Sequence, residues 1–193
     1  PHLFSSAASD VYKRQDYYTD AIDYTRLKIL DQFDEAEHAD GHCAHGEVHV
    51  VRRVPGYKKI RYYTHENVGY GHVRLPDQEM HTTAVWWHLP GGVLSSLFPN
   101  RWRALEAMLG AAHALHHVAC MAAMCELHDL GRSVGDAEGT WSATSSSEDP
   151  DMIVDARGQP FDPASTDQTF EPTLFLYDTY PGGIGLSEPL FHH

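Results

Sequence analysis

Residues 47–64 of this 193-residue chain read EVHVVRRVPGYKKIRYYT. Valine, isoleucine and tyrosine, which favour strands, are frequent on both sides of Pro55-Gly56. We predict two strands, residues 47–54 and 57–64, with Pro55-Gly56 as a hairpin turn between them and a bulge near Val54 as the alternative. Similar runs occupy residues 24–30 and 81–88, so we expect a small antiparallel sheet or partial barrel.

A different spacing begins near residue 100. From there to residue 125, apolar residues recur every three or four positions, as on one face of an amphipathic helix. The predicted stripe consists of Leu105, Met108, Leu109, Ala112, Leu115, Ala119, Ala122 and Ala123. Its alanines indicate close contact with another helix or a sheet, and Leu130-Gly131 is expected to end the helical region. A buried strand is expected at residues 172–178 and a helix start at Ser187.

The fold class predicted from these patterns is α+β, with the antiparallel module at residues 16–90 followed by a helix-led α/β subdomain at residues 91–193. Residues 133–172 contain nine acids, ten serines or threonines, and Arg157 as their only Lys or Arg. Such a composition buries little apolar surface, so we expect an acidic, mobile insertion in the second domain.

The N-terminal residues need separate treatment. Residues 5–15, SSAASDVYKRQ, resemble the in-frame translation of a sequencing adapter. We therefore expect residues 1–15 to be a disordered artefact outside the fold, and the rest to be a piece of a longer protein.

Overall charge and cysteine content limit the possible functions. The 14 Lys and Arg against 27 Asp and Glu give a net charge of −13, so nucleic-acid binding would need a local basic patch. No run of 18 apolar residues exists, which predicts no membrane-spanning helix and no membrane partner. Cys43, Cys120 and Cys125 form neither a disulfide scaffold nor a complete zinc site, which favours the reducing cytoplasm.

A local basic patch is present in residues 52–63, which carry five positive charges, three tyrosines and no acid. Lysine and arginine can hold a phosphate backbone, and tyrosine can stack on a base. The candidates for DNA contact are Arg52, Arg53, Lys58, Lys59, Arg61, Tyr62 and Tyr63. The alternative is an ordinary solvated strand face.

A glycine-rich motif, YDTYPGGIGLS, occupies residues 177–187. Glycines between a strand and a helix can expose backbone N–H groups to a phosphate, but the motif matches no nucleotide-binding pattern. We favour a structural turn, with Asp178 capping the turn or the helix. The motif residues are Asp178, Pro181, Gly182, Gly183 and Gly185.

The histidines offer one further alternative. His113 and His117 lie four residues apart on the predicted helix, and Asp129 could supply a third metal ligand. Ala114 and Leu115 replace the glutamate that H-E-x-x-H hydrolases use as a base, so a solvated or partly buried helix face is favoured. We assign no catalytic residue and no metal ligand.

Several longer motifs occur together in this chain. They are residues 46–50 (GEVHV) with 54–59 (VPGYKK), 63–71 (YTHENVGYG), 75–84 (LPDQEMHTTA), 110–115 (GAAHAL), 124–131 (MCELHDLG) and the motif at 177–187. In this order they resemble the C-terminal region of bacterial DEAD/DEAH-box DNA repair helicases of the mitomycin-repair type, including their metal-binding-type domain. Glu126 departs from the family pattern, which has an aspartate after the cysteine corresponding to Cys125.

The resemblance implies a parent protein that is a superfamily 2, ATP-dependent, 3′-to-5′ DNA repair helicase. The ATPase motor, which uses ATP with Mg²⁺, would lie upstream, and a structural Zn²⁺ would be bound by cysteines downstream of residue 193. For the chain itself we expect no cofactor and no ATPase activity. Its role would be to form part of the single-stranded DNA path and to brace the upstream motor domains.

Two other functions stay open. The acidic insertion at residues 133–172 could recruit a basic protein partner, which would make the chain an interaction module. A metal hydrolase built on His113, His117 and Asp129 is the second alternative.

Overall fold

The computed structural model describes residues 16–38, 41–98, 101–135, 142–143 and 173–192. They form one antiparallel sheet with few helices, so the chain is richer in sheet than the predicted α+β class suggests. The elements in chain order are β1 (Tyr17–His38), β2 (Gly41–Arg61), β3 (Asn67–His72), β4 (Gln78–His88), α2 (Gly91–Leu97), α3 (Arg101–Ala123), β5 (Leu130–Gly135), β6 (Ser142–Ala143), β7 (Thr173–Asp178) and α4 (Ser187–His192).

Strand β2 is continuous through Pro55-Gly56, so the predicted hairpin turn is wrong and the bulge alternative is confirmed. In the pairing with β1, Ile22 lies opposite Gly56 whereas Tyr24 lies opposite Arg53, so β2 carries one extra residue there. Proline fits a bulge because it has no N–H to donate, and the Pro55 carbonyl accepts a bond from Val73 N at 2.9 Å. The chain reverses instead after Arg61, before β3.

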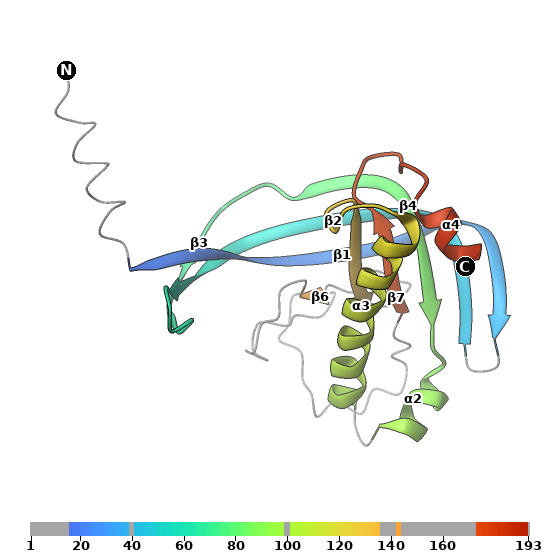
Figure 1. Cartoon of the computed structure of the whole chain (residues 1–193), viewed down its shortest axis with the longest axis horizontal. Helices are drawn as coiled ribbons and strands as arrows, with labels where there is room; N and C mark the ends of the chain where they lie inside the picture. The colour runs from blue at the N-terminus through green and yellow to red at the C-terminus, as the bar shows by residue number, and fades with distance from the viewer. Residues whose placement is uncertain (1–15, 39–40, 99–100, 136–141, 144–172, 193) are drawn as a thin grey trace.

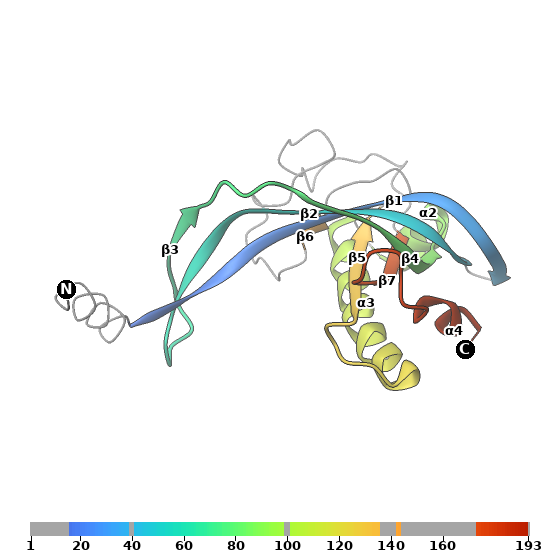
Figure 2. The ribbon, with the colours of Figure 1, turned by 90° about the horizontal axis from the view of Figure 1, so that it is seen from above.

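The three strands near this bulge form an arm that projects from the rest of the molecule. The arm consists of residues 17–22 of β1, residues 55–61 of β2, and β3. Strand β3 pairs with β2 from Gly56 to Ile60. Figures 1 and 2 both show these strands running well beyond α3 and β7. The basic stretch thus extends from the body onto the arm.

The other end of the sheet curls. In the strand order β5-β7-β4-β2-β1-β6, β5 lies at one end and β1 and β6 lie at the other. Because β5 still contacts both β1 and β6, the sheet must curl round on itself. The Tyr177 side chain of β7 hydrogen-bonds Thr25 of β1 inside the curl, and burial raises the pKa of Tyr177. Apolar side chains of four strands fill this interior: Leu27, Ala44, Val48, Val50, Ala84, Trp86, Phe175 and Tyr177.

The outer face of the curled sheet packs against α3 and α4 (Figure 1). Because side chains alternate along a strand, Val85, Leu174 and Leu176 point to this face whereas their neighbours fill the interior. Among the α3 side chains that the structure describes, the buried ones are Ala104, Met108, Ala112, His116, Ala119 and Cys120. The predicted stripe was thus partly wrong: Leu109, Leu115 and Ala122 are exposed, and the small side chains that face the sheet allow the close contact.

The predicted domain boundary near residue 90 is crossed by the sheet, because β5 and β7 continue it beside β4. Residues 133–135 of the predicted acidic insertion lie in β5 and are buried, and β6 pairs with β1 at Tyr24 and Thr25. The rest of that insertion, and residues 1–15, lie outside the described residues. No helix in the described part of the chain is long and apolar enough to cross a membrane.

Helix α3 ends at Ala123, seven residues before the Leu130-Gly131 stop that we predicted. Met124 adopts a left-handed conformation, with φ of 52°. Cys125 N donates to the Cys120 carbonyl at 3.1 Å, and Met124 N donates to the Met121 carbonyl at 3.4 Å. This pair of bonds is a Schellman motif, which usually has glycine at the position of Met124.

We predict that Met124→Gly stabilises the chain by about 0.5–1 kcal/mol, because glycine removes the Cβ that makes a left-handed conformation costly. The Met124 side chain is 92% exposed, so its loss costs little packing. The free energy of unfolding in urea measures the effect. As a matched control, Met121→Gly removes a 72% exposed methionine inside α3 and should destabilise by about 1 kcal/mol. Destabilisation by both changes would contradict the assignment.

Candidate nucleic-acid interface

The seven predicted DNA-contact residues lie on β2 and the turn after it, but the structure does not bring them into one patch. Lys58 and Tyr62 point to one face of the arm, together with Tyr18 of β1, whereas Lys59 and Arg61 point to the other face with Tyr17. Arg52 and Arg53 precede the bulge, towards the body. A nucleic acid would contact both faces of the arm to meet all of these residues.

Acidic partners compensate each of the three arginines. Arg52 Nε donates to Asp23 Oδ2 at 2.9 Å, and the Asp23 side chain is only 11% exposed. Arg53 binds Asp77 through two bonds of 2.8 and 2.6 Å. Arg61 lies 3.6 Å from both Asp16 and Glu66. The arginines therefore contribute less free positive charge than the sequence indicated.

Asp77 also shows the electrostatic effect of this pairing. The hydrogen bond from Arg53 lowers the pKa of the Asp77 carboxyl, and the same bond raises the pKa of Arg53. Both groups stay charged at neutral pH, and through the two hydrogen bonds between them they neutralise each other's charge.

The two lysines differ from the arginines. In the part of the chain that the structure describes, neither Lys58 nor Lys59 forms an ion pair with a carboxylate. Lys59 Nζ lies 5.5 Å from the centre of the Tyr17 ring, within the range of a cation–π contact. Lys58 and Lys59 therefore supply the least compensated positive charge of the basic stretch.

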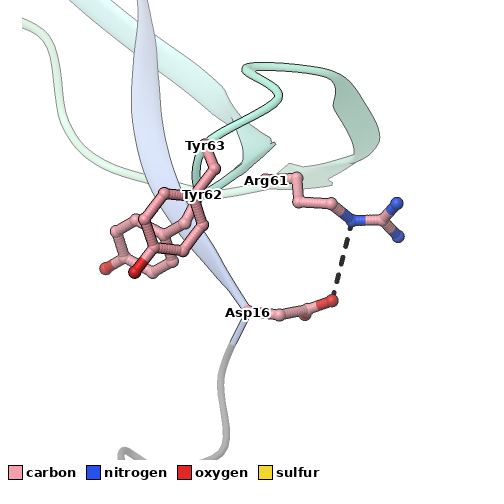
Figure 3. Close-up of a pocket in the computed structure, with 4 residues that line it drawn as sticks. All are labelled: Asp16, Arg61, Tyr62 and Tyr63. Carbon is pink, nitrogen blue, oxygen red and sulfur yellow. Dashed lines mark ion pairs between the residues drawn. The ribbon is translucent and has the colours of Figure 1, made fainter.

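The tip of the arm is aromatic. A shallow hollow there is lined by Asp16, Arg61, Tyr62 and Tyr63, and Figure 3 shows Arg61 and Tyr62 pointing away from each other. The Tyr62 ring lies 5.5 Å from that of Tyr18 and 6.5 Å from that of Tyr63. Tyr63 is 97% exposed and has a φ of 70°. Tyr18 was not among our candidates, because only the strand pairing places it beside Tyr62.

The glycine-rich motif forms a loop that binds its own carboxylate. Asp178 is fully buried at the end of β7, and its Oδ2 accepts backbone bonds from Ile184, Gly185 and Leu186 at 2.7, 2.9 and 3.2 Å. These N–H groups precede α4 and are the ones that could have held a phosphate. Asp178 occupies them, so the loop is a capped structural turn and not an anion cradle.

Positive φ angles explain the glycines of this loop. Gly182, Gly183 and Gly185 have φ of 83°, 74° and 80°, a region that other residues rarely adopt. A Cβ on Gly183 would also collide with the Thr83 side chain of β4. Gly182 N donates to the His81 carbonyl at 2.7 Å, which attaches the loop to the sheet edge.

The motif at residues 124–131 is hydrogen-bonded to the glycine-rich motif at residues 177–187. Thr179 N donates to the Asp129 carbonyl at 3.1 Å, and the Tyr180 hydroxyl donates to Asp129 Oδ1 at 2.9 Å. Asp129 Oδ2 accepts a bond from Glu126 N at 2.9 Å. The turn after α3 and the glycine-rich loop are thus one hydrogen-bonded unit, which no local signal in the sequence predicts.

The histidines of α3 do not assemble the predicted metal set. His113 and His117 are exposed, with ring centres 4.6 Å apart, and Asp129 is engaged by Tyr180. His116 is buried: its Nε2 donates to the Leu130 carbonyl at 2.8 Å and its Nδ1 accepts from Arg132 at 3.2 Å, because arginine can only donate. Burial lowers the pKa of His116, so it is neutral at pH 7.

Comparison with known families finds a similarity in the second half of the chain. Residues 111–193 match the family model of the MrfA Zn-binding domain. Among the described residues, however, no three His, Cys, Asp or Glu side chains gather closely enough to hold a metal ion. The described side chains therefore do not form a zinc site.

Individual relatives agree with this family match. The chain is 28% identical over 176 residues to the ATP-dependent helicase YprA of Bacillus subtilis (strain 168), covering 91% of this chain and 19% of YprA. A crystal structure of the DUF1998 helicase MrfA bound to DNA aligns with a TM-score of 0.51 and 29% identity, covering 92% of this chain and 20% of that one. The resemblance to the C-terminal region of the mitomycin-repair helicases is confirmed, and the chain spans about one fifth of these relatives.

We predict that Asp178→Ala destabilises the chain by about 2–4 kcal/mol, because three N–H groups lose a charged acceptor in a buried site. Denaturant unfolding measures the change. Asp20→Ala, at an exposed position on the arm, is the matched control and should shift stability by less than about 0.5 kcal/mol. Equal effects of the two substitutions would contradict the capping role.

Proposed function

We propose that this chain is the C-terminal accessory part of an ATP-dependent, 3′-to-5′ DNA repair helicase and that its arm contacts the single strand along which the motor moves. The observation that carries the proposal is the exposed aromatic tip of the arm, formed by Tyr18, Tyr62 and Tyr63. The least compensated lysines lie on the same arm, Lys58 on the face of Tyr18 and Tyr62 and Lys59 on the opposite face. Exposed aromatic clusters on a protruding element mark binding sites.

The chemistry of the arm suits a single strand better than a duplex. Tyrosine rings can stack on unpaired bases of any sequence, whereas bases in a duplex already stack on each other. Lys58 and Lys59 lie on opposite faces of one strand, so they can hold phosphates on both sides of the stacked bases. Arg52, Arg53 and Arg61 would add weaker attraction because their carboxylate partners cancel much of their charge.

The relatives support the larger context of this proposal. YprA is named as an ATP-dependent helicase, and the aligned MrfA structure is of a helicase bound to DNA. In the parent protein, ATP with Mg²⁺ would belong to the upstream motor domains. A structural Zn²⁺ would be held by residues beyond those described, downstream of residue 193. The chain itself would brace the motor and would not hydrolyse ATP.

We predict that Lys58→Ala with Lys59→Ala weakens binding of the 193-residue chain to an oligothymidine by about tenfold at moderate salt. Losing two phosphate contacts should also reduce the slope of log affinity against log salt by about 1.4. Fluorescence anisotropy at several salt concentrations measures both quantities. Lys28→Ala, an exposed lysine of β1 away from the arm, is the control and should leave both unchanged.

We predict that Tyr63→Ala weakens oligothymidine binding by about 1–3 kcal/mol with no change in salt dependence, because stacking involves no counterion release. Tyr63→Phe keeps the ring and should bind like the original chain. Tyr63 is 97% exposed, so neither change should alter the unfolding free energy. Unchanged affinity of both the Tyr63→Ala chain and the double lysine variant would refute the arm as the binding site.

A further inference from the structure

The end of α3 brings two free thiols together. Cys120 lies in the last turn of the helix and Cys125 follows its C-terminus. In the Schellman motif formed here, Cys120 and Cys125 occupy the two positions whose side chains contact each other across the cap. That contact usually joins two apolar side chains, and here the Cys120 and Cys125 thiols form a side-chain hydrogen bond with each other.

The surroundings of the two thiols differ. Cys120 is buried with 5% of its surface exposed, and its Sγ donates to the Glu126 carbonyl at 3.7 Å. Burial raises the pKa of Cys120 to about 11, and the adjacent Cys125 thiol and Asp129 carboxylate add to the shift. Cys125 is partly exposed, so an oxidant in solution reaches it first.

We propose that Cys120 and Cys125 form a reversible, oxidant-dependent disulfide that fastens the C-terminal cap of α3. With a small disulfide such as oxidised glutathione, the Cys125 thiolate attacks one sulfur and releases a glutathione thiolate. Cys120 then loses its proton and attacks the Cys125 sulfur, which releases the second glutathione thiolate. Two protein thiols are oxidised, and one glutathione disulfide is reduced to two thiols.

The location gives this bond a structural consequence. Cys125 begins the turn whose Asp129 holds Thr179 and Tyr180 of the glycine-rich loop. A disulfide would fix the start of that turn to α3, at the cost of the weak Cys120 bond to the Glu126 carbonyl. The oxidised chain would therefore have a more rigid link between α3 and the loop that precedes α4.

The test uses the 193-residue chain with Cys43→Ser, which removes the only other cysteine. The folded chain is treated with oxidised glutathione, quenched with an alkylating reagent and mapped by peptide mass spectrometry. We expect a Cys120–Cys125 disulfide as the main product, restored to two thiols by dithiothreitol. A stable glutathione adduct on Cys125 with Cys120 still free would overturn the proposal.

Further variants separate the geometry from simple proximity in sequence. Cys120→Ser should accumulate the glutathione adduct on Cys125, whereas Cys125→Ser should leave the buried Cys120 unmodified. Met124→Val keeps both thiols but disfavours the left-handed cap, and should lower the ratio of disulfide to adduct about tenfold, whereas Met124→Gly should preserve it. An equal ratio in the folded chain, in Met124→Val and in concentrated urea would show that the cap contributes nothing, and would overturn the proposal.

Discussion

The hydrogen-bonded pairing of β2 is the interaction on which the rest of the structure depends. This strand pairs with β1 along nearly its whole length, with β4 in the body and with β3 in the arm. The curled core, the outer face that receives α3 and the projecting arm are all built on one strand. Its bulge at Pro55 marks the point where the β4 pairing gives way to the β3 pairing, so a residue without an N–H group lies where the ladder changes partner.

The body of the molecule owes its compactness to polar contacts as much as to its apolar core. Asp178 supplies three hydrogen bonds to the turn before α4, and Asp129 joins the turn after α3 to the same loop. The Asp178 carboxylate is buried, and its Oδ2 is stabilised by three backbone N–H groups that would otherwise be unsatisfied at a turn and a helix start. The glycine-rich motif is therefore explained by the demands of the backbone, without a bound phosphate.

Local patterns in the sequence correctly predicted the strands at residues 24–30 and 81–88, the long helix and the strand ending at Asp178. They failed at Pro55-Gly56, because a turn and a bulge leave the same short-range signal and only the partner strand distinguishes them. They also failed to show that Arg52 and Arg53 are compensated, since Asp23 and Asp77 lie 29 and 24 residues away. The helix end at Met124 lacks the usual glycine, so its position follows only from the backbone geometry.

The bulge at Pro55 also determines how the arm can transmit force. The tip and the body share the same two strands, so a pull on Tyr62 or Tyr63 would pass to the body along β1 and β2 and not through a flexible linker. The register shift between Ile22 and Tyr24 interrupts the β1–β2 ladder at the base of the arm. Any tilting of the arm relative to the body would therefore act on this interrupted part of the β1–β2 ladder.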